Sequence, residues 1–369
     1  MARGELPDYP WDLMVPFRER AAAHHGGIVD LSIGSPVDPT PAVVRDALAE
    51  ATDAHAYPTT AGTGELRAEI VRWFERRRGV TGLGEANVLP TVGSKELVAL
   101  LPFLLGLGEG DVVVHPRAAY PSYEMGAVLV GATAMASDDP AEWPPATRLV
   151  WLNSPGNPDG RVLTVEELRA ARERALELGA IIVGDECYAE LGWDAPWDES
   201  PIPSILDPRV TGGGGRRDTL AIYSLSKQSN MAGYRAAFVA GCGGVIRRLT
   251  NVRKHAGLMV PAPLQHAMTV ALRDDAHVAE QKARYRERRT VLRAALEVAG
   301  YRIDGSEAGL YLWATAGEDA WDSLGRLADL GILAGPGHFY GVHYPEHVRF
   351  SLTASDERIA AAAERLRAA

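Results

Sequence analysis

Short runs of apolar residues recur through the middle of the chain, and segments with helical periodicity separate them. The runs lie at 112–115, 149–152, 180–184, 219–223 and 236–240. Their residues do not alternate between apolar and polar, so each run predicts a strand that is buried on both faces. We therefore expect an α/β protein in which helices cover both sides of a mainly parallel sheet.

Helix signals fall between these strands. Thr40 and Pro41 suit the cap and first turn of a helix, and Thr164 with Glu167 forms a capping box that opens another. A third helix is expected over 120–130. The glycines at 212–215 are expected to form a flexible surface loop, because neither a helix nor a phosphate-binding lysine follows them.

The pattern changes in the last third of the chain, where a long helical segment over 275–299 leads into a smaller lobe. The arginines at 284–293 within this segment are expected on a solvent-exposed helix face. Strands are then predicted near 310–314 and 348–352, and helices near 320–330 and 356–367.

The chain has 369 residues, more than one ordinary hydrophobic core supports, so we expect two domains. An N-terminal segment over 1–45 should join the smaller one. The large domain should span 46–270, and the small α+β domain 271–369. Polar residues of chemical interest follow the predicted strands of the large domain, where open α/β sheets bind their ligands.

Charge and cysteine content exclude several classes of protein. The 38 basic and 48 acidic residues give a net charge of −10, which argues against nucleic acid or an anionic membrane as a partner. Two cysteines, Cys187 and Cys242, are too few for a disulfide framework or, without other ligands, for a metal site. With no apolar run of ~18 residues and no apolar signal core near Met1, we expect a cytoplasmic protein that binds no metal and no membrane.

The strongest chemical signal directly follows the apolar run at 219–223. Lys227 stands beside the hydroxyls of Ser224 and Ser226, and a lysine so placed can form a Schiff base while the hydroxyls bind phosphate oxygens. Arg235 could bind the same phosphate dianion through two parallel hydrogen bonds. Ser-X-Ser-Lys alone would usually be a surface loop. Continued by Gly-Tyr-Arg, it resembles the cofactor-lysine motif of the class I and II aminotransferases of fold type I.

The resemblance implies a pyridoxal 5′-phosphate cofactor, and further motifs follow in the order that it requires. Asn153-Ser-Pro-Gly-Asn157-Pro-Asp-Gly is similar to the family's Asn-X-Pro-X-Asn-Pro-Thr-Gly turn, with Asp159 in place of Thr. Asn157 would donate to the phenolic oxygen of the cofactor ring, and Tyr188 would do so beside it. Asp185 would face the ring nitrogen and keep it protonated, so that the ring can act as an electron sink.

Other matched positions concern the phosphate and the ring face. Gly93, Ser94 and Lys95 precede a helical segment, whose free N–H groups and positive dipole end can cradle a phosphate. Tyr120 matches the aromatic residue that stacks on the ring, although an aromatic residue at such a position is more often part of a core. Tyr57 matches a tyrosine that is lent to the neighbouring subunit's phosphate, which implies a homodimer with composite sites.

Three positions concern the substrate. The resemblance implies that the backbone N–H of Gly34 meets the substrate carboxylate, that Asn157 borders the same group, and that Arg349 grips it. Arg349 lies in an apolar predicted strand, where burying a charge is costly unless it is paired. Both substrates, an amino acid and a 2-oxo acid, would be small molecules that use this clamp in turn.

The resemblance runs from about Gly34 to Leu352 and implies the fold-type-I architecture, a mostly parallel seven-stranded sheet flanked by helices plus a small α+β domain. The segments 6–12, 37–41, 93–96 and 335–341 are similar to the succinyldiaminopimelate aminotransferases of lysine and diaminopimelate biosynthesis. They imply N-succinyl-L,L-2,6-diaminopimelate and glutamate/2-oxoglutarate as substrates.

Three alternatives stay open. An aminotransferase of another specificity would carry the same motifs. So would a carbon–sulfur β-lyase, which would release pyruvate and ammonia from cystathionine without an oxo-acid acceptor. A non-catalytic regulator that senses the cofactor would normally carry a DNA-binding domain, and the sequence shows neither room for one before Gly34 nor a basic face.

Overall fold

The computed structural model describes residues 10–369. Seven strands form its central sheet in the order β2-β8-β7-β6-β5-β3-β4. Neighbouring strands are parallel except at β8, which is antiparallel to both β2 and β7. The strands are β2 (Val88–Val92), β3 (Val112–His115), β4 (Thr133–Ala136), β5 (Thr147–Asn153), β6 (Ile181–Asp185), β7 (Thr219–Ser224) and β8 (Ala236–Gly241).

Five of these strands coincide with the apolar runs of the sequence, and the predicted mostly parallel seven-stranded sheet is confirmed. The other two, β2 and β4, are the edge strands. β2 contains Pro90, which lacks a backbone N–H and is tolerated in a sheet mainly at an edge. β4 is partly exposed and short. Neither strand therefore has the continuous apolar character that identifies a central strand.

Helices cover both faces of this sheet, as the unalternating runs predicted. One apolar cluster joins one face to α3 (Gly64–Arg78), α6 (Val165–Glu177) and α10 (Ala262–Arg273). A second cluster joins the other face to α4 (Ser94–Leu104), α5 (Ser122–Val130) and α9 (Gly243–Ala256). Neighbouring residues of one strand, such as Val113 and Val114, belong to different clusters, because side chains alternate across a strand.

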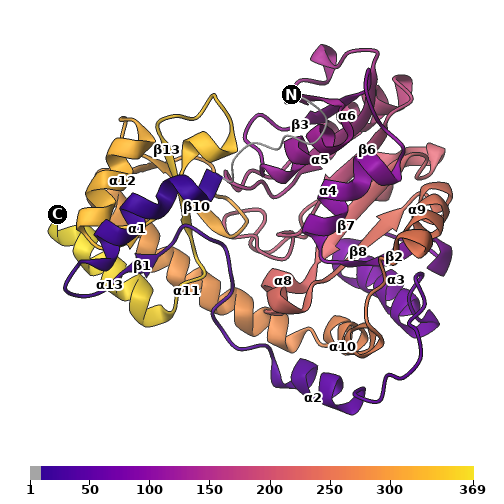
Figure 1. The fold of residues 1–369 in the computed structure, drawn as a ribbon, viewed down its shortest axis with the longest axis horizontal. Helices are drawn as coiled ribbons and strands as arrows, with labels where there is room; N and C mark the ends of the chain where they lie inside the picture. The colour runs from indigo at the N-terminus through magenta and orange to yellow at the C-terminus, as the bar shows by residue number, and fades with distance from the viewer. Residues whose placement is uncertain (1–9) are drawn as a thin grey trace.

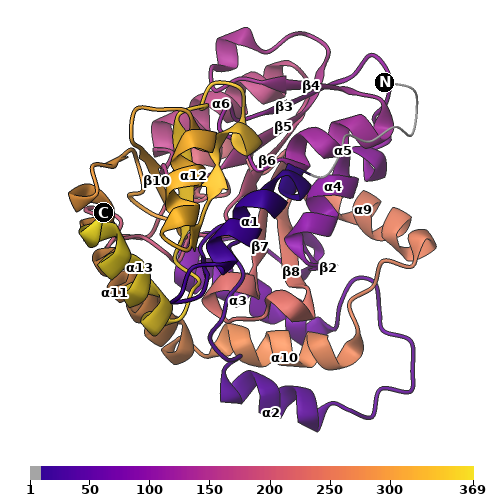
Figure 2. The same cartoon turned by 60° about the vertical axis from the view of Figure 1, so that its left-hand side comes forward.

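The predicted helix over 120–130 begins at Ser122. The capping box at Thr164 is present: its hydroxyl accepts from the N–H of Glu167, and the Glu167 carboxylate accepts from the N–H of Thr164. Thr40 does not cap α2 (Ala42–Glu50), which begins after Pro41; its hydroxyl donates to the carbonyl of Asn230 instead. α2 packs beside α10 on the outside of the molecule (Figures 1 and 2).

The last third of the chain forms a separate lobe with its own apolar cluster (Figure 1). Its antiparallel sheet has the order β12-β13-β10-β9, and β1 pairs in parallel with β11. N-terminal residues such as Val29 and Leu31 are part of this cluster. We propose domain boundaries near residues 45 and 270. The elements are η1 (Pro10–Met14), α1 (Val15–Ala22), β1 (Val29–Asp30), α11 (Ala276–Val298), β9 (Arg302–Ile303), β10 (Tyr311–Thr315), α12 (Ala320–Asp329), β11 (Ile332–Leu333), β12 (Gly335–Pro336), η6 (Gly337–Tyr340), β13 (His347–Ser351) and α13 (Asp356–Ala368).

A further expectation, about the arginines of α11, was wrong. The arginines of α11 do not all lie on a solvated face: Arg288 and Arg289 are buried, and Arg288 pairs with Asp38 and Asp356. The helix thus contacts chain segments far away in sequence, which its own composition cannot show. The glycines at 212–215 connect α7 (Pro208–Thr211) with β7; Gly212, Gly214 and Gly215 are exposed as expected, and Gly212–Gly214 form one 3-10 turn (η4).

Two further points concern the limits of the described chain. Residues 6–9 of the segment 6–12, which resembles the succinyldiaminopimelate aminotransferases, lie outside it. Among the helices of residues 10–369, none combines the length and the apolar character that crossing a membrane requires.

Candidate active site

Three neighbouring parallel strands end on the chemical motifs. β5 ends at Asn153, β6 at Asp185 and β7 at Ser224, and Asn153 lies opposite Asp185 in the sheet register. Because the carboxyl ends of parallel strands meet at one edge, motifs that are far apart in sequence come together there. The site is therefore a product of the sheet order.

Lys227 lies in the short helix α8 (Leu225–Gln228), which begins directly after β7. The side chain is half-buried, and its amine donates to the carbonyl of Gly34. Burial, together with the nearby charges of Arg349 and Arg235, lowers the pKa of the Lys227 amine below its ordinary value. A lysine with a lowered pKa is more often unprotonated, which is the nucleophilic form.

Asp185 is a buried carboxylate at the end of β6. The Tyr123 hydroxyl donates to Oδ2 at 2.8 Å, and the backbone N–H of Cys187 donates to Oδ1 at 3.2 Å. Both of these donors are neutral groups, and burial raises the pKa of Asp185. A bound cation would offset the free-energy cost of burying this carboxylate in its charged form, and a protonated ring nitrogen is such a cation.

Gly93 and Ser94 stand at the start of α4, with the guanidinium of Arg235 against them. Gly93 has φ 77°, and a Cβ atom there would lie 2.3 Å from Arg235 Nη2, so only glycine leaves this space. Arg235 has a left-handed φ of 58°, and its Nη1 donates to the Ala232 carbonyl at 2.7 Å. Helix N–H groups and a guanidinium at one place make an anion cradle.

The two serines of the lysine motif differ in what they contact. Ser224 Oγ caps α8 by accepting from the N–H of Ser226 at 3.2 Å, and it lies 2.8 Å from Ser226 Oγ. Ser224 is thus engaged in local structure. If Ser224 donates to Ser226, the Ser226 hydroxyl keeps its own proton for another acceptor, so Ser226 is the better placed of the two for an anion.

Asn157 and Arg349 meet across the two lobes. Arg349 Nη1 donates to Asn157 Oδ1 at 2.8 Å, and Arg349 Nη2 donates to the Ser32 carbonyl at 2.7 Å. The first contact orients the Asn157 amide so that its Nδ2 faces away as a donor. The backbone N–H of Asn157 donates to Asn153 Oδ1 at 2.8 Å, which holds the turn in place.

The Arg349 guanidinium is buried but faces no carboxylate in the described part of the chain. It is only 3% exposed, and its described partners are oxygens of neutral groups and the rings of Tyr311 and Tyr340. Its Nε atom is buried without a hydrogen bond. Burying a guanidinium without an anionic partner is destabilising. A bound carboxylate would supply that partner, because its two oxygens match the two parallel N–H groups of the guanidinium.

Three expected positions lie at or beyond the margin of this cluster. Lys95 is exposed, and its ammonium lies 5.9 Å from the ring centre of Tyr120, so these two predicted residues are neighbours. Tyr57 is 96% exposed, and no contact of the described residues joins it to this cluster. The structure thus brings together the predicted residues other than Tyr57.

Tyr311, Tyr123 and Ser32 also belong to the cluster, and sequence reasoning missed their part in it. Tyr311 contacts the Arg349 guanidinium with its ring, at 3.9 Å, and Tyr188 with its hydroxyl, at 3.2 Å. The sequence signal was only that Tyr311 lies in the predicted strand 310–314. The structure adds that Trp313 lies opposite Arg349, so that Tyr311, two residues before Trp313, points to the same face.

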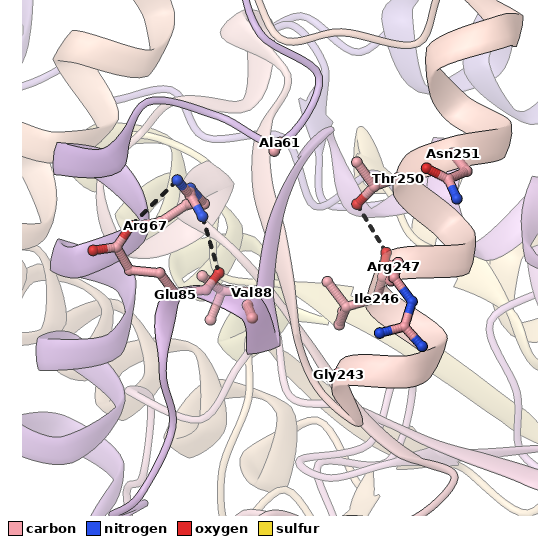
Figure 3. A pocket seen from close by; sticks show the side chains of 10 residues that line it. Ala61, Arg67, Glu85, Val88, Gly243, Ile246, Arg247, Thr250 and Asn251 are labelled. Carbon is pink, nitrogen blue, oxygen red and sulfur yellow. Dashed lines mark hydrogen bonds and ion pairs between the residues drawn. The ribbon is translucent and has the colours of Figure 1, made fainter.

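A separate surface depression of about 240 Å³ lies between α3, β2 and α9 (Figure 3). Arg67 and Glu85 form an ion pair of 3.2 Å on one side of it, and the Thr250 hydroxyl donates to the Ile246 carbonyl on the other. None of the predicted site residues lines it. The Lys227 cluster is therefore the candidate active site.

The cluster fits the cofactor that the motifs imply. It offers a lysine amine, an anion cradle, a buried carboxylate without a cationic partner, and a free amide donor at Asn157. These are the groups that an aldehyde, a phosphate, a protonated ring nitrogen and a phenolic oxygen require.

Comparison with known proteins agrees with this chemistry. The family model of aminotransferase class I and II matches residues 27–366. The chain is 54% identical to 4-dedimethylamino-4-oxo-anhydrotetracycline transaminase OxyQ of Streptomyces rimosus, over 98% of this chain and 99% of that protein. It is 51% identical to the probable aminotransferase Rv1178 of Mycobacterium tuberculosis, over 98% of this chain and 85% of that protein.

A solved structure gives the same result for the fold. The probable N-succinyldiaminopimelate aminotransferase of Thermus thermophilus superposes with a TM-score of 0.85 at 29% identity, over 97% of this chain and 99% of that one. The family match covers nearly the whole chain and includes every motif of the site. The chain therefore belongs to the class I and II aminotransferases, which depend on pyridoxal 5′-phosphate.

Proposed function

We propose that this aminotransferase moves an amino group between N-succinyl-L,L-2,6-diaminopimelate, or a related acidic amino acid, and 2-oxoglutarate/glutamate, in diaminopimelate and lysine biosynthesis. The observation that supports an amino-acid substrate is the buried Arg349 guanidinium without a carboxylate partner. The likeness to the Thermus thermophilus protein supports the choice of substrate.

The proposed cofactor contacts follow from the donors and acceptors of the cluster. Gly93, Ser94, Lys95, Ser226 and Arg235 would bind the phosphate. Asp185 would hold the ring nitrogen, and Asn157 and Tyr188 the phenolic oxygen, with Tyr120 against the ring. Ser224 would support the phosphate site mainly by capping α8. When bound, the cofactor supplies an electron sink for the negative charge that develops at the substrate Cα.

Lys227 would be both the attachment point and the proton carrier. The lowered pKa of the Lys227 amine favours its unprotonated form, which can accept a proton. The Gly34 carbonyl accepts a hydrogen bond from this amine in the present arrangement. The same segment would place the backbone N–H of Gly34 near the substrate carboxylate, so arrival of substrate and release of the amine would be coupled.

Arg349 would serve both substrates in turn. An amino acid and a 2-oxo acid share an α-carboxylate, so one guanidinium can orient the donor in the first half-reaction and the acceptor in the second. Asn157 would help by holding Nη1 in place and bordering the substrate. This shared use is the physical basis of a ping-pong reaction at a single site.

The first prediction concerns Lys227 and tests this proposal. Borohydride should fix the cofactor on the Lys227 peptide and on no other; the sequence has only Lys95, Lys254 and Lys282 besides. Lys227→Ala should bind cofactor but lose nearly all turnover, whereas Lys254→Ala, at an exposed position, should keep both. Multiple turnover by Lys227→Ala without added amine would contradict the proposal.

A donor panel with 2-oxoglutarate as acceptor separates the substrate candidates. We expect the highest kcat/KM with N-succinyl-L,L-2,6-diaminopimelate. Pyruvate and ammonia from cystathionine in the absence of any oxo acid would instead identify a β-lyase. The panel includes the alternative of another amino-acid specificity, which a different preferred donor would reveal.

A second candidate function is amination of a polycyclic ketone. The 54% identity with the anhydrotetracycline transaminase over nearly both whole chains favours it. Such an acceptor has no α-carboxylate, so Arg349 would serve only the amino-acid donor. Amination of a tetracyclic ketone by wild type, with Arg349→Ala impaired in the donor half-reaction alone, would support this function over the first.

We also propose that the protein works as a homodimer in the cytoplasm. The 96% exposure of Tyr57, a large aromatic side chain, supports a residue that finds its contacts in another subunit. Both cysteines are free, which suits a reducing compartment.

A further inference from the structure

Two buried phenols meet between the lobes of the molecule. Tyr188 follows β6 of the large sheet, and Tyr311 begins β10 of the small lobe. Their hydroxyl oxygens are 3.2 Å apart, and their rings pack edge to face with centres 5.7 Å apart. Tyr188 is 8% exposed and Tyr311 only 4%. The contact is thus a hydrogen bond that little water competes for.

Tyr311 is surrounded by cations and by the N-terminal segment. The Arg349 guanidinium carbon lies 3.9 Å from its ring centre. Its hydroxyl stands so close to Gly34 that a Cβ atom there would be 2.2 Å away. Packing on three sides leaves the hydroxyl few places to turn, so its bond to Tyr188 is well defined.

The two phenols differ in acidity. Burial raises the pKa of Tyr188 well above its ordinary value. Burial alone would also raise the pKa of Tyr311, but the charges of Arg349 and Lys227 outweigh it, so that pKa is lowered. In a pair of phenols joined by one hydrogen bond, the more acidic one donates. The Arg349 guanidinium, 3.9 Å from the Tyr311 ring centre, favours Tyr311 as the donor of the bond between the two hydroxyls, and the Tyr188 proton then stays available for another acceptor.

We propose that Tyr311 is a positioning residue that donates to the Tyr188 oxygen and thereby directs and strengthens the hydrogen bond from Tyr188 to the phenolic oxygen of the cofactor. The inference rests on the proposed role of Tyr188. A hydroxyl that accepts one hydrogen bond becomes a stronger donor in the next, so the effect of Tyr311 passes through Tyr188. Neither phenol need transfer a proton.

The experiment titrates the visible absorption of the cofactor-loaded enzyme with pH. Its midpoint reports the proton on the Lys227–cofactor linkage. A donor to the phenolic oxygen stabilises negative charge there and weakens the hold on that proton, so removing a donor raises the midpoint. Tyr311→Phe keeps the ring on Arg349 and should raise the midpoint by about 0.3 pH unit or more.

Comparison variants isolate the path through Tyr188. Tyr188→Phe should raise the midpoint further, and Tyr188→Phe with Tyr311→Phe should match Tyr188→Phe alone, because Tyr311 then has nothing to act on. Tyr340→Phe removes a buried hydroxyl from the other ring on Arg349 and should leave the midpoint unchanged. Tyr311→His, which keeps a ring and a donor, should restore part of the wild-type midpoint.

The outcomes separate this inference from the proposed function. Failure of wild type to bind cofactor on Lys227 would contradict the proposed function itself. A loaded Tyr311→Phe enzyme with a wild-type midpoint but a raised substrate KM would overturn the inference alone, since Tyr311 would then contact substrate. Additive shifts in the double variant would also overturn it. If Tyr311→Phe does not fold, Tyr311→His decides: a midpoint as high as that of Tyr188→Phe would overturn the inference.

Discussion

At the scale of single residues, the site holds two buried charges of opposite sign that the protein leaves without counter-charges. Asp185 and Arg349 each accept or donate hydrogen bonds only with neutral groups of the described chain. A protein that needed only stability would pair or replace such groups, because an unpaired buried charge is destabilising. Ligands that carry the missing charges would make both sites favourable.

Removing the charge of Asp185 tests whether this carboxylate faces the ring nitrogen of the cofactor. In Asp185→Asn the ring nitrogen should lose its proton, and the rate should fall by about 10²–10⁴, the scale of one positioned acid–base partner. Single-turnover kinetics measure the loss, and cofactor content serves as the control. Near-wild-type turnover at full cofactor loading would show that Asp185 does not face the ring nitrogen.

Replacing Arg349 tests whether its guanidinium binds the carboxylate of both substrates. Truncating one partner of a buried charge pair costs about 2–5 kcal/mol, or about 30- to 5,000-fold in binding terms. Arg349→Ala should lose kcat/KM on that scale for an amino acid and a 2-oxo acid alike, with unchanged cofactor absorbance. Arg349→Lys should also be impaired, because an ammonium cannot make the two parallel hydrogen bonds of a guanidinium. Loss in one half-reaction only would argue against a shared clamp.

At the scale of elements, α11 connects three distant parts of the chain. Arg288 binds both Asp38 oxygens at 2.7 Å, and Gln281 of the same helix donates to Asp38 at 2.8 Å. Asn230, three residues after Lys227, donates to Gln281 at 2.8 Å. The helix runs between the two lobes (Figure 1). It therefore holds the segment that contains Gly34 in a fixed relation to Lys227.

Asp38→Asn should weaken this connection. Breaking a buried ion pair costs about 3 kcal/mol at the lower end of the usual range, and Arg288 keeps Asp356 as a second partner. Urea unfolding at neutral pH measures the loss. Asp53→Asn, at a fully exposed ion pair with His55, is the matched control and should change stability little.

The pH dependence of that difference follows from the pKa of Asp38. Burial alone would raise this pKa, but hydrogen bonds from Arg288 and Gln281 and the charge of Arg288 lower it in the folded state. The contribution of the Asp38–Arg288 pair to the free energy of unfolding is therefore fully present above the unfolded-state pKa of about 3.9. The contribution disappears as the pH falls through the folded-state value, so wild type and Asp38→Asn should converge in acid. A difference that grew in acid would contradict the pairing.

At the scale of the whole molecule, the proposed homodimer concerns the segment around Tyr57. The Thr63 N–H donates to Gln265 of α10 at 2.8 Å, which fastens one end of the segment to the large domain. The Tyr57 side chain itself is almost fully exposed. An ordered backbone that presents an aromatic side chain outward is typical of a contact with another subunit.

Mixed subunits test this arrangement. Lys227→Ala and Tyr57→Ala enzymes should each be impaired, the second through weaker cofactor binding. If Tyr57 serves the neighbouring subunit, a mixed dimer contains one intact site and mixing should restore activity. Light scattering measures the assembly. A fully active monomer, or no recovery in demonstrated mixed dimers, would exclude the composite site.

The sequence by itself determined the features that depend on neighbouring residues. Unalternating apolar runs specify central strands because both faces must be buried, and the Thr164–Glu167 box is complete within four residues. The lysine motif and the Asn157 turn are likewise local, so their residue types already indicated the cofactor chemistry. The edge strands were not predicted, because Pro90 interrupts the apolar run of β2 and β4 is short and partly exposed.

Only the tertiary structure decided which distant residues meet. Arg349 and Asn157 are 192 positions apart and Tyr311 and Tyr188 are 123 apart, so no local pattern could pair them. Their contacts depend on how β10 pairs with β13 and how the small lobe packs against the large sheet. The burial of Arg288 has the same origin, since its carboxylate partners come from opposite ends of the chain. Local sequence sets backbone geometry over a few residues, whereas burial and charge pairing depend on the whole packed chain.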